Sequence, residues 1–422
     1  MRAYLRTFGC RANHYDSERV VALLRRAGVE TTDDVADADV AIFNSCTVTA
    51  QAEAELRKSV RRAARQRPGV RSIVMGCAAG LPADHPSTAA LRALPTVERL
   101  VPGADLAALA DALALPPAGA VAATPQTGTR ALLRIQDGCD EHCTFCLTTL
   151  ARGASRSRPP DELVAEATAL AERHPEIVLT GIHIGSYGVD TGGSLGALLE
   201  RLVHAVPRVR FRLSSLEATE VDPRLAELLT GDATRVAPYL HAPLQSGSDA
   251  VLRRMGRHWY TAESYARAVE ALAARGGAFG LGADVITGFP GEREADHAAT
   301  VRLVERLPFT YLHVFPFSPR PGTAATRLAD TLHPELADAR ARELRAIGER
   351  KRAAHATARA GAIADVIVVG PAAGGREGLT EDYLTVQLDE PGLPRGTRFA
   401  ARLTERDGVL WAGGLRPRNR EG

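Results

Sequence analysis

The residues best suited to chemistry are three cysteines in one short stretch, Cys139, Cys143 and Cys146, just after the apolar run 131–135. Their spacing places three thiolates on one loop at the end of a strand, and such a loop can hold three irons of a cubane iron–sulfur cluster. A structural zinc site would close its tetrahedron with a fourth protein ligand. The missing fourth ligand therefore favours a cluster with one iron open to a small molecule. A zinc knuckle or an incidental group of cysteines is the alternative.

The pattern Cys-x3-Cys-x-aromatic-Cys, with Phe145 in the aromatic place, resembles the signature of the radical S-adenosylmethionine (SAM) enzymes. In that superfamily the open iron binds the amino and carboxylate groups of SAM. The resemblance implies that Cys139, Cys143 and Cys146 bind a 4Fe-4S cluster and are catalytic, and that Phe145 belongs to the cofactor site.

Three further cysteines, Cys10, Cys46 and Cys77, each follow a short apolar run that we interpret as a strand. Helical patterns separate these runs, which predicts βαβ units with a parallel sheet. Ligands of open α/β sheets gather at the carboxyl ends of the strands, so the three thiols can converge on one site. Taken alone, dispersed cysteines are more often buried core residues. The predicted strands are 2–7, 40–44 and 72–75, and the predicted helices are 16–26 and 51–65.

The segments around these cysteines resemble the N-terminal domain of the methylthiotransferases, a radical SAM subfamily with a second 4Fe-4S cluster. The resemblance implies that Cys10, Cys46 and Cys77 bind that second cluster. Asp16 or Ser17 is also expected to cap the first helix, since short polar side chains accept hydrogen bonds from its first N–H groups. The matching segments are 8–18, 44–48 and 75–79.

Residues at other predicted strand ends resemble SAM contacts of the same superfamily. Gly181 would let the backbone approach a ligand closely, although a tight turn alone also explains a glycine there. The segment 151–158 after the cluster loop also matches the family, and at least one of its three arginines, Arg152, Arg156 and Arg158, is expected to bind the SAM carboxylate or RNA phosphates, with solvated surface charge as the alternative. Arg156 is the one assigned to the cofactor. The cofactor-binding residues implied in this way are Phe145, Gly181, His183, Glu217, Gln245 and Arg156.

Three domains are expected to position these residues, and the predicted fold class is α/β. Residues 1–118 are predicted to form an α/β domain with a parallel sheet. Residues 125–355 alternate six strands with helices, which predicts a partial (β/α)6 barrel whose open side admits a macromolecule. Residues 358–420 show short strands separated by Gly and Pro turns, hence a small β-barrel that resembles the TRAM domain, an RNA-binding module. The core strands are predicted at 131–136, 176–180, 209–214, 239–244, 278–286 and 310–317.

Composition places the chain among ordinary globular proteins, with 45% hydrophobic and 24% charged residues in 422. A formal net charge of +2 is too small to indicate a nucleic-acid protein by itself, so RNA contacts would need local basic patches. No stretch is long and apolar enough to span a bilayer, and the N-terminus lacks the layout of a signal peptide. We therefore expect a cytoplasmic protein with no membrane partner, in which its six cysteines bind metal rather than form disulfides.

The resemblance also implies a reaction. SAM is cleaved by an electron from a donor such as a flavodoxin or ferredoxin, and the resulting 5′-deoxyadenosyl radical abstracts a hydrogen atom from the substrate. The second cluster then passes a methylated sulfur to the substrate carbon.

Members of the family differ in their targets. These are N6-threonylcarbamoyladenosine beside the tRNA anticodon, N6-isopentenyladenosine at the same place, and an aspartate of a ribosomal protein. The segments 10–18 and 136–139 look most like the threonylcarbamoyladenosine enzyme, which implies methylthiolation at C2 of that base at tRNA position 37. A base of the anticodon loop can be splayed out to reach a buried site. The alternative from another class is a non-catalytic, metal-dependent RNA-binding protein.

Overall fold

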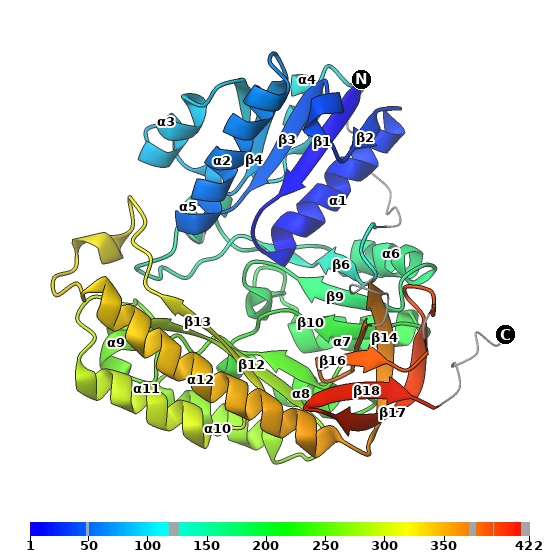
Figure 1. The fold of residues 1–422 in the computed structure, drawn as a ribbon, viewed down its shortest axis with the longest axis vertical. Coiled ribbons are helices and arrows are strands. Elements are labelled where there is room, and N and C mark those ends of the chain that lie inside the picture. The colour runs from blue at the N-terminus through cyan, green and yellow to red at the C-terminus, as the bar shows by residue number, and fades with distance from the viewer. Residues whose placement is uncertain (48–49, 118–125, 371–376, 391, 415–422) are drawn as a thin grey trace.

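The computed structural model describes residues 1–47, 50–117, 126–370, 377–390 and 392–414 of the 422-residue chain. Three units follow one another: an N-terminal α/β sheet, a partial barrel below it in Figure 1, and a small C-terminal β-barrel beside the partial barrel. The predicted fold class and the order of the units are confirmed. The predicted boundary between residues 118 and 125, and the last residues of the third predicted domain, lie outside the described residues.

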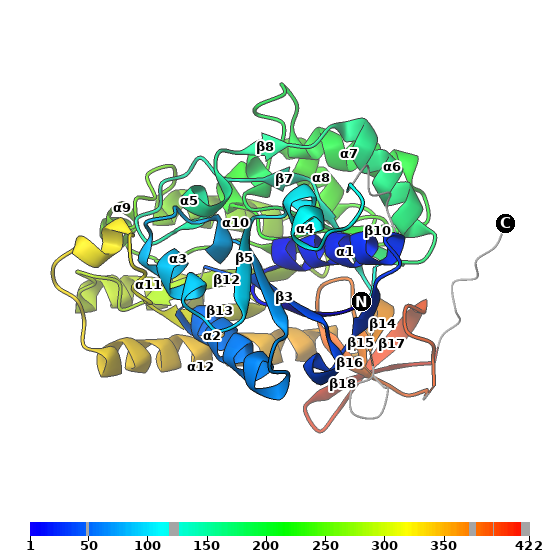
Figure 2. The same ribbon diagram turned by 90° about the horizontal axis from the view of Figure 1, so that it is seen from above.

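The N-terminal unit is a five-stranded parallel sheet with helices on both faces. Its strands are β1 (Arg2–Thr7), β2 (Glu30–Thr32), β3 (Val40–Ser45), β4 (Arg71–Gly76) and β5 (Val97–Pro102), and its helices are α1 (Arg11–Arg26), α2 (Ala50–Gln66), α3 (Pro86–Arg92) and α4 (Leu106–Ala112). The strand order is β2-β1-β3-β4-β5. Ile42 packs with α1 and α4 while its neighbour Phe43 packs with α2 and α3, since side chains of a strand alternate between faces. Figure 2 shows these two helix layers on either side of the sheet.

The edge strands β2 and β5 are missing from the prediction, because most of their residues are exposed or half-buried and their apolar pattern is weak. The start of α1 was also predicted wrongly. The helix begins at Arg11, with Cys10 as an N-cap whose side chain makes no hydrogen bond to the helix backbone. Asp16 and Ser17 therefore lie inside the helix and do not cap it; both are buried.

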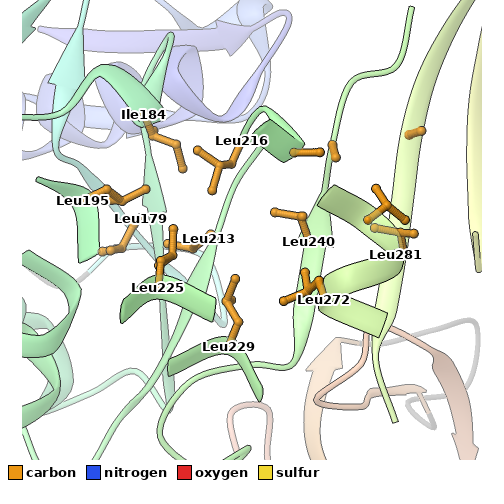
Figure 3. Close-up of a cluster of buried hydrophobic side chains, with 14 of the residues drawn as sticks. Leu179, Ile184, Leu195, Leu213, Leu216, Leu225, Leu229, Leu240, Leu272 and Leu281 are labelled. Atoms are coloured by element: carbon orange, nitrogen blue, oxygen red, sulfur yellow. The ribbon is translucent and has the colours of Figure 1, made fainter. Parts of the chain in front are cut away.

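The partial barrel consists of two three-stranded parallel sheets, β10-β9-β6 and β11-β12-β13, which meet at a bridge between Ser215 and His241. Six strands in this curved order confirm the predicted partial barrel. Leucines from the strands, such as Leu213 and Leu240, pack against leucines of the outer helices, such as Leu225 and Leu272 (Figure 3). The strands are β6 (Ala131–Arg134), β9 (Glu176–Thr180), β10 (Arg210–Leu213), β11 (Tyr239–His241), β12 (Gly280–Thr287) and β13 (Tyr311–Pro316); the helices are α6 (Pro160–Ala171), α7 (Leu195–Ala205), α8 (Pro223–Thr230), α9 (Asp249–Arg254), α10 (Ala262–Ala273) and α11 (Glu294–Arg306).

The long helix α12 (Pro334–Arg359) leads to a closed C-terminal barrel in the order β14-β15-β16-β18-β17. Its strands are β14 (Ile363–Gly370), β15 (Glu377–Leu379), β16 (Thr385–Leu388), β17 (Arg398–Arg406) and β18 (Val409–Gly413). The predicted small β-barrel is confirmed. Among the described helices, none is both long and apolar enough to cross a bilayer.

Buried ion pairs join the C-terminal barrel to the partial barrel. Glu176 of β9 lies 2.6 Å from Arg210 Nε and 2.9 Å from Arg212 Nε, and all three side chains are fully buried. Arg210 also contacts Asp365 of β14 at 3.1 Å, and Arg212 donates to Thr380 O at 3.2 Å. Although burial opposes ionisation of Glu176, the two arginines outweigh it and lower the pKa of this carboxyl well below its ordinary value. The junction is therefore a charged network closed to solvent.

Candidate active site

The first cysteine trio, Cys139, Cys143 and Cys146, lies on the loop between β7 (Gln136–Asp137) and α5 (Thr148–Arg152). Cys139 and Cys143 are half-buried and Cys146 is exposed. Because β7 directly follows β6, the loop opens at the carboxyl end of a barrel strand, where the active sites of (β/α) barrels are found. The predicted position, on a loop leaving a strand, is confirmed.

The loop path is fixed by its neighbours. Thr144 N donates to Met255 O at 2.8 Å, and Thr144 O accepts from Ala325 N at 2.8 Å. Gly138, which precedes the trio, has φ of +77°, and a Cβ there would lie 1.9 Å from Ala154 O. Only glycine fits this position, since any side chain would meet backbone. The protein thus shapes the loop by its own contacts.

All three sulfurs of the first trio accept hydrogen bonds from nitrogen, and Cys146 Sγ does so from Thr148 N at 3.3 Å. Glu141 N donates to Cys139 Sγ at 3.4 Å, and Arg257 Nη1 donates to Cys143 Sγ at 3.5 Å. Burial raises the pKa of Cys143 to about 12, against the influence of Arg257. A thiolate at this depth needs positive charge beside it, which a coordinated metal and the guanidinium would supply together.

The second trio, Cys10, Cys46 and Cys77, comes together at the carboxyl ends of β1, β3 and β4. Asn13 lies among these cysteines: its Oδ1 accepts from Cys10 Sγ at 3.4 Å and from Cys77 Sγ at 3.8 Å. A Cβ on Gly9 would lie 2.7 Å from Cys46 Sγ. Because glycine has no side chain, the backbone after β1 can pack directly on Cys46. The predicted convergence of three dispersed cysteines is therefore what the fold produces.

Arg152 of α5 connects the cluster loop to the second trio. Its Nε donates to Cys77 Sγ at 3.2 Å, its Nη2 to Asp16 Oδ2 at 2.8 Å and its Nη1 to Asp137 Oδ1 at 3.3 Å. Burial raises the pKa of Cys77 to about 12, an effect that the guanidinium reduces. One buried arginine thus neutralises charge at the second trio while anchored beside the loop of the first.

The spacing of the sulfurs fits clusters better than single ions. Among the described His, Cys, Asp and Glu residues, the one set of three ligand atoms lying within 4.8 Å of one another is that of His241, Asp284 and His313. Neither cysteine trio is therefore gathered as tightly as the ligands of one zinc ion. A cubane takes each thiolate on a different iron, so wider spacing is what its ligands need. Each trio therefore offers three thiolates to a cluster and lacks the close spacing of the ligands of a single zinc ion.

Two of the residues expected to contact SAM lie beside the first trio. Gly181 packs so closely on Gln136 that a Cβ would lie 2.9 Å from the amide oxygen, and the same oxygen accepts from His183 N at 2.9 Å. His183 Nε2 lies 2.7 Å from Glu220 Oε1. Burial disfavours its charged form, but hydrogen bonds with Cys139 and Glu220 outweigh burial and raise the pKa of His183 to about 10.

Three further expected contacts line the same end of the barrel. Buried Glu217 forms an ion pair with Arg257. Burial raises the pKa of the Glu217 carboxyl, and the nearby guanidinium only partly offsets this rise. Phe145 packs edge-on against Phe289 with ring centroids 6.2 Å apart. Gln245 has φ of +61°, a conformation that costs a non-glycine residue energy and is concentrated at functional sites.

Arg156 is exposed, and its guanidinium donates to Ala154 O and Arg152 O of its own loop. Its role toward SAM stays a prediction. Two arginines donate to the sulfurs, Arg152 to Cys77 and Arg257 to Cys143, and neither was assigned to the site from the sequence. Arg152 belongs to the basic segment next to the cluster loop and could have been chosen from it, whereas Arg257 is 114 positions from Cys143 and gives no signal.

Two known families match the two parts of the chain that carry the cysteine trios. Residues 2–92 match the family described as "Uncharacterized protein family UPF0004", and residues 133–304 match the "Radical SAM superfamily". A solved structure of similar fold is the radical SAM methyltransferase TsrM from Kitasatospora setae with cobalamin and a [4Fe-4S] cluster bound. It has a TM-score of 0.52 and 16% identity and covers 77% of this chain and 76% of that one.

Relatives with closer sequences have related names. Threonylcarbamoyladenosine tRNA methylthiotransferase MtaB from Bacillus subtilis is 36% identical over 82% of this chain and 79% of its own length. The tRNA-2-methylthio-N(6)-dimethylallyladenosine synthase from Cereibacter sphaeroides is 33% identical over 96% of both chains. The chain therefore belongs to the radical SAM methylthiotransferases, whose cofactors are S-adenosylmethionine and 4Fe-4S clusters.

Proposed function

We propose that this protein adds a methylthio group to C2 of N6-threonylcarbamoyladenosine at position 37 of tRNA. The observation that carries the proposal is the presence of two separate cysteine trios, one at the barrel and one at the N-terminal sheet, linked by Arg152. When bound, SAM and the two clusters would supply hydrogen-atom abstraction and sulfur transfer.

We propose the following roles for the residues, from the resemblance of the motifs that carry them. Cys139, Cys143 and Cys146 hold the cluster that binds SAM, with Phe145, Gly181, His183, Glu217, Gln245 and Arg156 proposed around the cofactor. Cys10, Cys46 and Cys77 hold the second cluster. The N-terminal sheet lies over the partial barrel (Figure 1) and would limit the access of water to a reacting carbon between the two sites.

The choice of tRNA as substrate draws support from the relatives. The proteins from Bacillus subtilis and Thermotoga maritima, 36% and 33% identical to this chain, are both named for threonylcarbamoyladenosine of tRNA. The relative from Cereibacter sphaeroides is named for the dimethylallyl, that is isopentenyl, nucleoside, which keeps that base as the second candidate. The electron donor would be a flavodoxin or ferredoxin.

The test is mass analysis of tRNA nucleosides from a strain lacking this protein and from its parent. Loss of the methylthio group from threonylcarbamoyladenosine alone is the expected result. Loss from the isopentenyl nucleoside instead would assign the other base, and no change in either would contradict a role at position 37. Iron and sulfide analysis of anaerobically purified protein should give about eight irons per chain, whereas zinc alone would contradict both clusters.

A further inference from the structure

Arg11 follows Cys10 of the second trio and faces the partial barrel. Its Nη2 donates to the hydroxyl of Tyr383 at 3.1 Å, and its guanidinium is also hydrogen-bonded to Tyr239. None of the described carboxylates lies within 4.0 Å of it, in contrast to the buried Arg152 and Arg210, each of which has an acidic partner. Arg11 is therefore a cation fixed by phenol groups alone, next to a proposed cluster ligand.

The surface below Arg11 is the inner face of β11, β12 and β13. In the strand register Tyr239 pairs with Gly280, His241 with Gly282 and Gly282 with Tyr311. A Cβ on Gly282 would lie 1.9 Å from the Tyr311 ring, so this glycine lets the ring lie flat on the sheet. The Tyr239 and Tyr311 rings are parallel within 6°. Aromatic rings therefore cover this face of the sheet.

This aromatic face extends along β13 toward the cluster end of the barrel. His313 and Phe315 follow Tyr311 at alternate positions, with ring centroids 5.2 Å apart for Tyr311 and His313 and 6.4 Å for His313 and Phe315. Both His313 and Phe315 are exposed, Phe315 at 44%. Tyr311 is held in place by hydrogen bonds to Tyr239 at 2.6 Å and to His241 Nδ1 at 2.8 Å. The exposed rings of His313 and Phe315, next to the half-buried and hydrogen-bonded Tyr311, form a surface on which a base can stack.

Two features of the ligand follow. The stacking surface suits a purine, and the uncompensated guanidinium suits an anion, since arginine binds a carboxylate through two parallel hydrogen bonds. Threonylcarbamoyladenosine offers both an adenine and, on its threonyl group, a carboxylate; the isopentenyl nucleoside has no such charge. Resting on the function proposed above, we propose that Arg11 binds the carboxylate of the threonylcarbamoyl group while the aromatic face of β13 supports the adenine. Arg11 is then the residue that selects this base.

The test measures binding of anticodon stem-loop RNAs to the full chain, loaded with iron and sulfide without oxygen, by fluorescence anisotropy. The three RNAs carry threonylcarbamoyladenosine, its methyl ester or isopentenyladenosine. The protein without substitutions should bind the RNA with the free carboxylate roughly 10- to 100-fold more tightly than the RNA with the methyl ester. This ratio corresponds to the free energy of one hydrogen bond to a charged group. Arg11→Gln should abolish this preference and Arg11→Lys should retain part of it.

The control is Arg71→Gln, the same substitution at the opposite end of the N-terminal sheet, where the side chain pairs with Glu98 on the surface. It should keep the preference for the free carboxylate. An equal loss of affinity of Arg11→Gln for all three RNAs would assign the arginine to a backbone phosphate and overturn the proposal. Equal binding of acid and ester by the unmodified chain would overturn it even if Arg11→Gln failed to fold.

The two proposals fail separately. If tRNA from the deletion strain keeps its methylthio group on threonylcarbamoyladenosine, the proposed function is wrong. If that group is lost but the chain does not distinguish the acid from the ester, only the role of Arg11 is wrong.

Discussion

The two cysteine trios are built in opposite ways. The first lies within eight consecutive residues on one loop, while the second is assembled from the ends of three strands that are up to 67 positions apart in the chain. Both place sulfur beside a buried arginine, Arg257 in one case and Arg152 in the other. The same ligand chemistry thus arises once from local spacing and once from sheet topology. A local trio should tolerate changes elsewhere in the fold, whereas the dispersed trio should depend on the register of the N-terminal sheet.

The strongest test of this comparison removes one ligand from each trio. Cys143→Ser and Cys46→Ser should each abolish methylthio transfer, because neither proposed cluster can replace the other. Each variant should retain about four of about eight irons per chain, measured by iron analysis after anaerobic purification. A variant that loses all its iron would show that the trios do not form independently.

The second trio should also lose its iron when a residue at the end of β1 other than a cysteine is substituted. In Gly9→Ala the new Cβ would lie 2.5 Å from Cys46 Cβ at a φ of +102°, so one strand end must move. We expect loss of iron from the second trio and retention at the first. Gly28→Ala is the matched control: its φ is +69° with no atom within 4 Å, so it should cost only about 1 kcal/mol of folding free energy and keep all the iron.

Arg152→Gln tests the link between the trios. Buried Asp16 would lose one of its two arginine partners, and breaking a buried ion pair typically costs about 3–5 kcal/mol. The free energy of unfolding, measured by urea titration, should fall by that order. Arg156→Gln, four positions along and exposed, should change it by less than about 0.5 kcal/mol. Equal effects of the two variants would mean that Arg152 does not carry the contact between domains.

The smallest expected effects come from removing one polar side chain that holds each cysteine trio in place. Asn13→Ala removes the amide that contacts Cys10 and Cys77 and leaves Ser45 O without its side-chain donor, which should cost about 1–3 kcal/mol. Thr144→Ala removes a single hydrogen bond to Arg254 O and should cost about 1 kcal/mol. Iron release to a chelator should accelerate at the second trio for Asn13→Ala and at the first for Thr144→Ala. Faster release from both trios in either variant would contradict their independence.

The features that could be predicted from the sequence depend on neighbouring residues, and those that could not depend on contacts between residues far apart in the chain. Strand β9 was predicted with its observed bounds because its centre, 177–179, is apolar and β-branched in two of three positions, and the cluster loop was predicted from spacing alone. The start of α1 was missed because Cys10, which precedes it, is not one of the short polar residues that usually cap a helix and does not bond to the helix backbone. Arg257 and the phenol groups around Arg11 were missed because their contacts depend on folding across more than a hundred positions.

The charged junction around Glu176 also affects how a truncation of the C-terminal barrel must be interpreted. Cutting the chain after α12 would remove Asp365 and the Thr380 carbonyl and bring Arg210 and Arg212 to a new surface with Glu176 as their remaining acidic partner. The shortened chain would therefore be destabilised for a reason unrelated to RNA. A loss of tRNA affinity on truncation could therefore come from this destabilisation alone. Single substitutions on the outer face of the C-terminal barrel, rather than its deletion, are the way to test whether the barrel contributes to tRNA binding.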